Sequence, residues 1–303
     1  MNNKNSTEKT LTKVAIQGIR GSFHEIAATN FFKNEQLGFI ECETFEDTVN
    51  QLERGSAEYA VMAIENTVAG SLLGNYTLLR ENKVKIIGEE YLRIKQNLMA
   101  LPGENIEGIK EVHSHHMAIN QCRSFFKLYP GIKLVESSDT ALSARLIREG
   151  NIRGRGAIAG DLAADLFRLE ILASGIETNK RNYTRFLVLR SDKMLSEKSC
   201  KELPVRFADE VNKASLCFSL PHQRGSLANI LTILSDDGLN LTKIQSMPIM
   251  GQEFRYFFYT DVVFGSYGDF LKAVRQITSY VNEIFILGEY AQASGSIESI
   301  HKA

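Results

Sequence analysis

The chain has 303 residues, of which 44% are hydrophobic and 23% charged, and its 35 basic and 36 acidic residues give a formal net charge of −1. This length predicts at least two domains with real hydrophobic cores. The balanced charge excludes a broad basic surface for duplex nucleic acid or anionic lipid. No apolar run is long enough to span a membrane, and the polar segment 1–13 has no apolar signal region. We therefore predict a cytoplasmic protein without nucleic-acid or membrane partners.

Residues 14–190 alternate short apolar runs with amphipathic segments. This alternation favours parallel β-sheets with helices on both faces. Because the stretch is long for a single sheet, we predict an α/β fold of two lobes with a cleft between them. The predicted strands are 14–16, 59–64, one ending at Val112, 133–136 and 156–160. Two predicted helices begin at Ser22 and Thr44, each with capping-box spacing. Four more are predicted at 72–81, 118–128, 140–149 and 161–167.

The C-terminal third follows a different plan. Residues 191–212 are polar, contain Pro204, and are predicted to be a linker, while 1–13 and 293–303 are predicted tails, the first disordered. Between them, 213–292 reads in the order β-α-β-β-α-β, which is that of a ferredoxin-like unit. The predicted strands are 214–220, 239–249, 254–264 and 283–287, with helices at 226–236 and near 270–277.

Cysteine and histidine spacing gives little support for a metal site. The four cysteines, which form no Cys-x-x-Cys pair, are typical of reduced intracellular thiols; they are Cys42, Cys122, Cys200 and Cys217. The run His113-Ser-His-His116 places only two imidazoles on one strand face, whereas zinc needs three convergent ligands. We predict no metal.

The turn Gly18–Ser22 lies between a predicted strand and a helix N-terminus. Backbone N–H groups and the helix dipole favour an anion there, although a plain tight turn fits equally well. Without a Gly-x-Gly-x-x-Gly pattern, a dinucleotide is not expected.

Polar side chains lie next to predicted strands or apolar runs at three further places. Glu65-Asn66-Thr67 comes directly after the strand 59–64, at the sheet edge where α/β proteins bind ligands, although an Asx turn is an alternative. Ser114 and Gln121 offer a hydroxyl and an amide at a second such edge. Residues 181–186, Arg-Asn-Tyr-Thr-Arg-Phe, precede an apolar run and could form a carboxylate site or a solvated strand end.

In these motifs the chain resembles the prephenate dehydratase family over nearly its whole length. The glycine turn resembles the family's opening motif, Glu65-Asn66-Thr67 its Glu-Asn-Ser/Thr motif, and Thr184-Arg185-Phe186 its Thr-Arg-Phe signature. Ser114-His115 through Gln121-Cys122 resembles its Ser-His and Gln-Cys segment, and 213–292 its ACT regulatory domain.

The resemblance implies a periplasmic-binding-protein-like catalytic domain at 14–190, followed by an ACT domain of βαββαβ type. It implies the decarboxylating dehydration of prephenate to phenylpyruvate in L-phenylalanine biosynthesis, without a cofactor, by a homodimer or homotetramer. The implied catalytic residues are Thr184, Asn66, Ser114 and Gln121. The implied substrate-binding residues are Arg185, Glu65, Thr67, Phe186, Gly21 and Ser22.

The resemblance also implies an effector site for L-phenylalanine. Its residues would be Gly225, Ser226, Leu227, Asn229, Ser246, Met247 and Pro248. Gln245-Ser-Met-Pro248 stands where the family commonly has Glu-Ser-Arg-Pro, so a charge of each sign is missing. Feedback by phenylalanine is therefore a hypothesis, with weakened or altered sensitivity as one form of it. A second departure is His24, which replaces a hydroxyl residue of the opening motif.

Two other functions stay open. An arogenate dehydratase would perform the same chemistry on a substrate that carries an amino group. A non-catalytic amino-acid sensor would combine the same cleft and regulatory module but would bind its ligand without turnover. Measured turnover separates the enzymes from the sensor.

Overall fold

The structure is a computed structural model that describes residues 11–33, 35–192 and 211–293. Their contacts divide the chain into two compact units, unit 1 with residues 11–71 and 92–186 and unit 2 with 72–91 and 187–293. The predicted boundary instead left 72–91 and 187–190 in the catalytic domain; that boundary stays a prediction. Most of the predicted linker, nearly all of both predicted tails and Cys200 lie outside the described residues.

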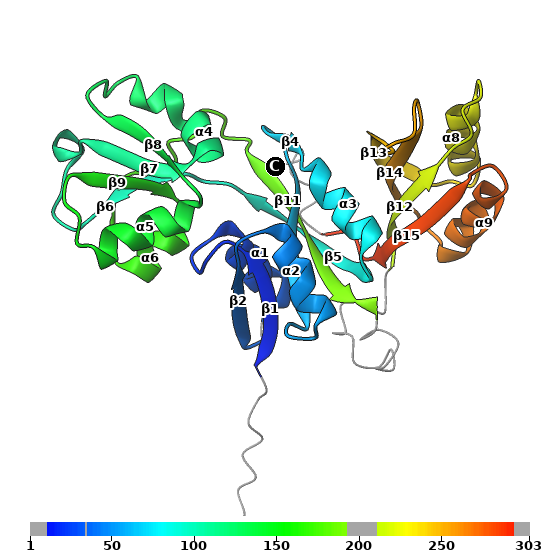
Figure 1. The fold of residues 1–303 in the computed structure, drawn as a ribbon, viewed down its shortest axis with the longest axis horizontal. Helices are drawn as coiled ribbons and strands as arrows, with labels where there is room; N and C mark the ends of the chain where they lie inside the picture. The colour runs from blue at the N-terminus through cyan, green and yellow to red at the C-terminus, as the bar shows by residue number, and fades with distance from the viewer. Residues whose placement is uncertain (1–10, 34, 193–210, 294–303) are drawn as a thin grey trace, which may run out of the picture. The chain divides into compact units, whose positions relative to one another are not determined.

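The first lobe of unit 1 is a mostly parallel sheet with strand order β11-β3-β1-β2 (Figure 1). Its core strand β1 buries Val14, Ala15 and Ile16 completely. Ser22 accepts a hydrogen bond from the Glu25 N–H and begins α1, and Thr44 forms a complete capping box at α2. The elements are β1 (Thr12–Gln17), α1 (Phe23–Phe32), β2 (Leu37–Cys42), α2 (Phe45–Glu53), β3 (Tyr59–Asn66), β4 (Gly70–Ser71) and the first residues of β11 (Tyr183–Ser191).

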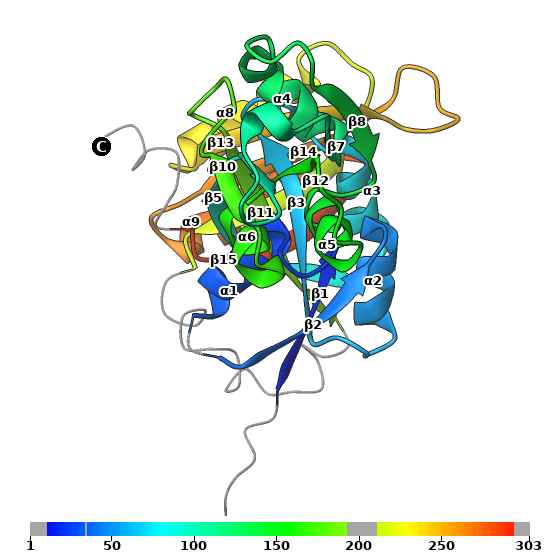
Figure 2. The same ribbon diagram turned by 90° about the vertical axis from the view of Figure 1, so that its left-hand side faces the viewer.

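The second lobe of unit 1 is a mixed sheet with strand order β10-β6-β9-β7-β8. β7 runs parallel to β8 and β9, so the three strands predicted for this lobe are parallel as expected. The sheet is mixed because β6, which was not predicted, is antiparallel to β9 and β10. Helix α4 packs on one face and α5 and α6 on the other (Figures 1 and 2). The elements are β6 (Asn97–Ala100), η1 (Ile106–Gly108), β7 (Glu111–His115), α4 (His116–Phe126), β8 (Lys133–Ser137), α5 (Thr140–Glu149), β9 (Arg155–Ala159), α6 (Asp161–Phe167) and β10 (Glu170–Ala173).

Two segments of the chain connect the lobes, residues 92–96 and 174–182. They run side by side, because the Ile94 N–H donates to the Asn182 carbonyl and the Ile176 N–H to the Gln96 carbonyl, each at 2.7 Å. The connection therefore holds together two segments that are far apart in the sequence.

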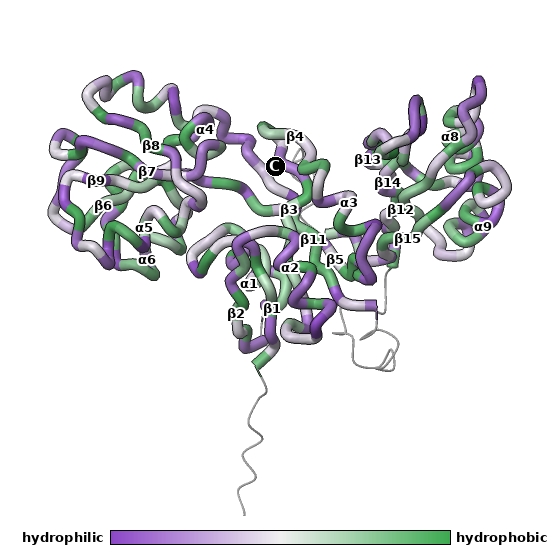
Figure 3. Tube along the Cα trace, viewed as in Figure 1, coloured by the Kyte–Doolittle hydropathy of each residue, from purple (hydrophilic) through white to green (hydrophobic). Residues whose placement is uncertain are grey.

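Unit 2 contains the βαββαβ order predicted for the C-terminal region, with strand order β13-β14-β12-β15-β5. Helices α8 and α9 cover a core that includes Phe218, Ile230 and Phe270. In Figure 3, β12 is mostly hydrophobic and the hairpin joining β13 to β14 is hydrophilic. The elements are α3 (Leu73–Glu81), β5 (Val84–Arg93), β12 (Lys213–Ser219), α8 (Ser226–Asp236), β13 (Asn240–Pro248), β14 (Tyr256–Val263), α9 (Tyr267–Thr278) and β15 (Glu283–Tyr290).

Five of the strands in the described residues had no counterpart in the sequence prediction: β2, β4, β5, β6 and β10. β5 is the instructive case, because Glu89 interrupts its apolar pattern yet is only 2% exposed. Its carboxylate is held by the ammonium of Lys213, a partner 124 residues away that no local pattern reveals. Among the described residues, no helix is long and apolar enough to cross a membrane.

Candidate active site

A cluster of amide and hydroxyl side chains lies in unit 1 where β3 and β11 meet the second lobe. The Asn66 Nδ2 lies 2.7 Å from Asn182 Oδ1, 2.9 Å from Thr184 Oγ1 and 3.1 Å from the Tyr183 carbonyl. Its Oδ1 accepts from the N–H groups of residues 68 and 69, so the predicted Asx turn is also present. Because Asn66 is held at both ends of its amide, it presents its N–H groups to Thr184 and Asn182 in a fixed orientation.

Asn182 joins the two lobes. It is fully buried, accepts from Asn66, and donates through Nδ2 to Gln121 Oε1 on α4 at 2.9 Å. The sequence prediction placed Asn182 in the polar stretch 181–186 but assigned it no role. We call Asn66, Gln121, Asn182 and Thr184 the amide–hydroxyl cluster.

Thr184 has the group best placed for chemistry. Its hydroxyl oxygen accepts from Asn66, and among the described residues its own proton has no acceptor. The Nε2 group of Gln121 likewise has no acceptor within the described ranges, while its Oε1 is occupied by Asn182. The cluster therefore offers O–H and N–H donors to a ligand.

Arg185 does not join this cluster. Successive residues of a strand point to opposite faces, so Arg185 faces away from Thr184. Its side chain is 3% exposed, and its Nη1 lies 3.3 Å from Glu65 Oε1. The predicted carboxylate anchor thus already faces a carboxylate of the chain.

Thr67 and Phe186 support β11. The Thr67 hydroxyl donates to the Arg181 carbonyl and accepts from the Tyr183 N–H, each at 2.9 Å. Phe186 is buried and packs edge-on against His24 at 5.0 Å between ring centroids. Burial lowers the pKa of His24 to about 4, and its Nε2 accepts from the Ala63 N–H, so the imidazole is neutral.

Among the described residues, Ser114 makes no hydrogen bond with the amide–hydroxyl cluster. It is fully buried, and its hydroxyl donates to the Ile158 carbonyl of the neighbouring strand at 2.7 Å. This bond uses its only proton within the sheet.

The glycine turn before α1 holds anions that the chain itself supplies. The Gly21 N–H donates to Glu25 Oε2 at 2.6 Å, and the Arg20 N–H donates to Glu41 Oε1 at 2.8 Å. Gly21 has φ of +88°, and a Cβ on it would lie 3.3 Å from Ala163 Cα on α6. The glycine is therefore explained by close packing of the two lobes. The Gly21 N–H and the Ser22 hydroxyl oxygen are both engaged with Glu25.

The histidine run has local partners. His113 Nε2 lies 3.2 Å from Glu111 Oε1, and His115 caps α4 by accepting from the Met117 N–H. Within the described ranges, no group of three His, Cys, Asp or Glu side chains is placed to hold a metal ion.

Unit 2 has two neighbouring hollows at the start of α8, where Gly225 adopts φ of +83°. Ser226 lines both, Leu227 lines one and Asn229 the other. The sequence prediction missed the aromatic side chains of the hollow that Leu227 lines. The residues lining this hollow are Leu220, Pro221, His222, Gln223, Ser226, Leu227, Phe254, Tyr256 and Phe258. The predicted Ser246, Met247 and Pro248 lie on β13, paired with residues 256–258 of β14.

These features define a two-lobed α/β protein with a polar cluster between its lobes and a ferredoxin-like unit after it. The family model described as prephenate dehydratase matches residues 14–194. The chain belongs to the prephenate dehydratase family, as its motifs suggested.

Relatives differ in the substrate that their names give. Arogenate dehydratase 2 of Petunia hybrida is 32% identical over 96% of this chain and 74% of its own length. The bifunctional chorismate mutase/prephenate dehydratase of Aquifex aeolicus is also 32% identical, over 95% of this chain and 75% of its own.

Solved structures support the fold. A structure described as GqqA, a novel type of quorum quenching acylases, has a TM-score of 0.80 and 28% identity, and covers 93% of this chain and 98% of its own. Prephenate dehydratase of Arthrobacter aurescens in complex with L-Phe has a TM-score of 0.79 and 24% identity, with 96% and 97% covered. The expected two-lobed domain with a βαββαβ unit is confirmed.

Proposed function

We propose that this chain converts prephenate to phenylpyruvate in L-phenylalanine biosynthesis, and that the amide–hydroxyl cluster is its active site. The observation that carries the proposal is the convergence of Asn66, Gln121 and Thr184, which are far apart in the sequence, around Asn182. Asn66, Gln121 and Thr184 each belong to a different motif of the family.

The decarboxylating dehydration of prephenate needs few catalytic groups from the protein. Prephenate has a carboxylate and a hydroxyl at opposite positions of a cyclohexadiene ring. The bond to the carboxylate breaks and releases carbon dioxide, its electron pair enters the ring, and the C–OH bond breaks. The departing hydroxide takes a proton and leaves as water. Because the ring becomes aromatic, the reaction is strongly downhill, and the enzyme needs only to hold the dianion and assist the leaving oxygen.

Thr184 is the donor to the leaving oxygen. Asn66 donates to the Thr184 Oγ1 at 2.9 Å, which makes the hydroxyl proton more acidic and directs it away from Asn66. A threonine is too weak an acid to act alone, so the Gln121 amide shares the developing negative charge. Preorganised donors of this kind stabilise the charge of a transition state without reorganising.

In this proposal, seven of the predicted residues have structural roles and do not contact the reacting atoms: Ser114, Arg185, Glu65, Thr67, Phe186, Gly21 and Ser22. Each contacts other residues of the protein, as described above. The Ser114→Ala variant is the simplest direct test of this assignment.

The aromatic-lined hollow of unit 2 is the proposed effector site for L-phenylalanine. Support comes from Phe254, Tyr256 and Phe258, whose rings offer an apolar lining, and from Ser226, which offers a hydroxyl. Prephenate turnover measured against added phenylalanine tests it. Loss of turnover supports the site, and unchanged turnover together with no binding of phenylalanine in calorimetry removes it.

We infer a cytoplasmic homodimer or homotetramer from the family resemblance. Sedimentation equilibrium at micromolar concentration tests the assembly, and a monomer at all concentrations contradicts it.

The decisive assay is phenylpyruvate formation from prephenate by the purified chain at neutral pH, with phenylalanine formation from arogenate in a second arm. We expect turnover of prephenate well above its spontaneous rate. Turnover of arogenate alone would replace the substrate, and binding without turnover in either arm would favour the amino-acid sensor.

A further inference from the structure

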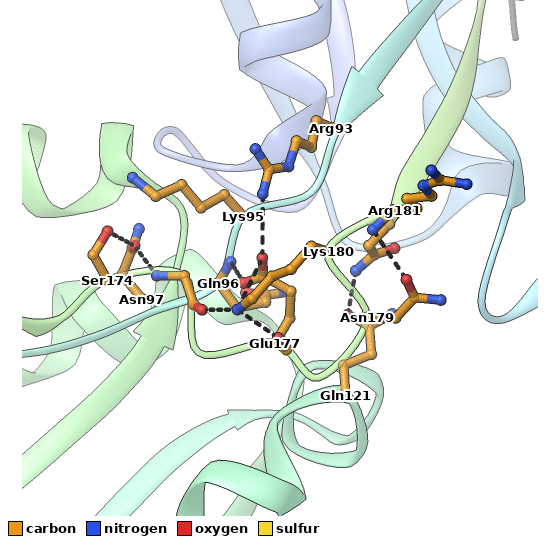
Figure 4. A network of polar contacts seen from close by, with 12 residues as sticks. Arg93, Lys95, Gln96, Asn97, Gln121, Ser174, Glu177, Asn179, Lys180 and Arg181 are labelled. Carbon is orange, nitrogen blue, oxygen red and sulfur yellow. Dashed lines mark hydrogen bonds and ion pairs between the residues drawn. The ribbon is translucent and has the colours of Figure 1, made fainter. Parts of the chain in front are cut away.

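The two segments that connect the lobes carry basic side chains that the mechanism above does not use. Arg93 and Lys95 lie on one segment, and Lys180 and Arg181 on the other (Figure 4). The hydrogen bond from the Ile94 N–H to the Asn182 carbonyl places the first segment directly against the amide–hydroxyl cluster. These cations are therefore anchored beside the proposed active site.

Arg93 has an available guanidinium. Its side chain is 50% exposed and makes no hydrogen bond with the described residues; its acidic neighbour is Glu177, with 3.8 Å between Nη2 and Oε1. A guanidinium with free N–H groups is the side chain best suited to bind a carboxylate through two parallel hydrogen bonds. Arg185, in contrast, is buried against Glu65.

Lys180 is the second cation beside the Glu177 carboxylate. Its Nζ donates to the carbonyl oxygens of Gly175 and Glu177 and lies 3.7 Å from Glu177 Oε1. An ammonium has three N–H donors. One of them stays available for a ligand.

Glu177 attracts both cations by its charge, and its carboxylate accepts no hydrogen bond from either of them. It is 1% exposed, and its Oε2 accepts from the Gln96 N–H at 2.9 Å. Its Oε1 is buried and has no hydrogen-bond donor among the described residues, although Arg93 and Lys180 both face it (Figure 4). Buried polar atoms without a partner are uncommon in native proteins and call for an explanation. Here the carboxylate attracts both cations at a distance that leaves N–H groups of each able to bind a ligand.

The charge of the connecting segments matches a dianion. Lys95 pairs with Asp161 at 3.2 Å, and within the described ranges Arg181 has no acidic partner. Arg93 and Lys180 face the single carboxylate of Glu177, and Arg181 adds a third positive charge. The three cations therefore leave an excess of two positive charges beside the amide–hydroxyl cluster.

We propose that Arg93 and Lys180 bind a carboxylate of the dianionic substrate, and that Glu177 is a positioning residue that orients both cations. This inference rests on the proposed function, because the ligand is the dicarboxylate of that same site. It replaces Arg185 as the carboxylate anchor.

The first test is Arg93→Gln in the full chain. We expect KM for prephenate to rise roughly 10- to 100-fold, the range of a lost charge-assisted hydrogen bond, with kcat changed less than about threefold. Arg93→Lys, which keeps the charge and loses the two-pronged geometry, should give an intermediate KM. The matched control is Arg148→Gln on α5, which removes the same charge at an exposed position and should leave KM unchanged.

Glu177→Gln separates positioning from simple neutralisation. If Glu177 only cancelled positive charge, removing its charge would strengthen attraction for the dianion and lower KM. Because we assign Glu177 to orienting Arg93 and Lys180, we expect KM to rise in Glu177→Gln. In Arg93→Gln, we expect the dependence of KM on salt concentration to become shallower.

The outcomes distinguish this inference from the proposed function. A wild-type KM in Arg93→Gln, or a lower KM in Glu177→Gln, would overturn the anchor and leave the activity intact. A wild-type chain that converts neither prephenate nor arogenate would overturn the proposed function itself.

Discussion

Two buried polar networks, one in each unit, differ in how completely their members satisfy one another. In unit 2, the Lys213 ammonium lies 2.8 and 2.9 Å from the two oxygens of Glu89, and Ser215 bonds to Asp261 and Tyr290. In unit 1, the amide–hydroxyl cluster is built of neutral groups, and Thr184 and Gln121 keep donors without an acceptor among the described residues.

The difference separates stability from chemistry. Buried charges that are paired with each other make removal of one partner costly and leave little capacity for a ligand. Neutral groups fixed on one side and open on the other are prepared to bind a developing charge. Strong burial alone therefore does not mark an active site; spare hydrogen-bonding capacity at a fixed position does.

The largest effect on stability should come from Lys213→Met, which leaves the Glu89 carboxylate buried without its cation. We expect a loss of about 3–5 kcal/mol in the free energy of unfolding, measured by denaturant titration, with kcat per folded molecule unchanged. The double variant Lys213→Met, Glu89→Leu should recover much of the loss. A single variant within about 1 kcal/mol of wild type would show that the pair is not the structural element we describe.

Asn182→Ala should have the opposite signature. Removing the side chain that joins Asn66 to Gln121 misplaces both, and we expect kcat to fall about 100-fold in a chain that still folds. The matched control is Asn120→Ala, an exposed asparagine on α4 whose loss should leave kcat within about twofold. Equal kcat values in the two variants would remove Asn182 from the site.

The apolar support behind β11 predicts a pH dependence of stability. The pKa of His24 is about 4 in the folded chain, below its value of about 6.5 when unfolded. The unfolded chain therefore binds the proton more readily, and stability is lost as pH falls from 6.5 toward 4. This residue should contribute a loss of about 2 kcal/mol between pH 7 and pH 5.

The measurement is the free energy of unfolding against pH for the wild type and His24→Asn. We expect a shallower slope in the variant over this range. Parallel slopes would mean that His24 is accessible to protons in the folded chain.

Ser114→Ala should have the smallest effect. Because its hydroxyl bonds to the Ile158 carbonyl, we expect a loss of about 1 kcal/mol in stability and kcat within about threefold of wild type. A large fall in kcat at normal stability would return Ser114 to the catalytic residues that its motif suggested.

The sequence supported the choice of Asn66, Gln121 and Thr184 because each belongs to a polar motif next to a predicted strand or apolar run. It could not show how Arg185 and the glycine turn would be used. Their partners, Glu65 and Glu25, are acidic residues of the chain that satisfy the same chemistry as a ligand carboxylate. A motif indicates what a group can bind and leaves open whether the protein itself already supplies the partner.

The residues that were missed have long-range causes. Asn182 becomes central only when α4 and β3 approach β11, and Glu177 and Arg93 meet only because two segments run side by side between the lobes. β5 was missed for the same reason, since the partner of Glu89 is distant in sequence. The βαββαβ order of unit 2 needed only local periodicity and was predicted correctly.

The central claim is that the Thr184 hydroxyl assists departure of the leaving oxygen. The direct test compares Thr184→Val with Thr184→Ser at saturating prephenate, with thermal unfolding as the check on folding. The account predicts that Thr184→Val loses about 100-fold or more in kcat while KM stays near wild type, and that Thr184→Ser stays within about tenfold of wild type. A Thr184→Val variant with near-normal kcat would contradict it.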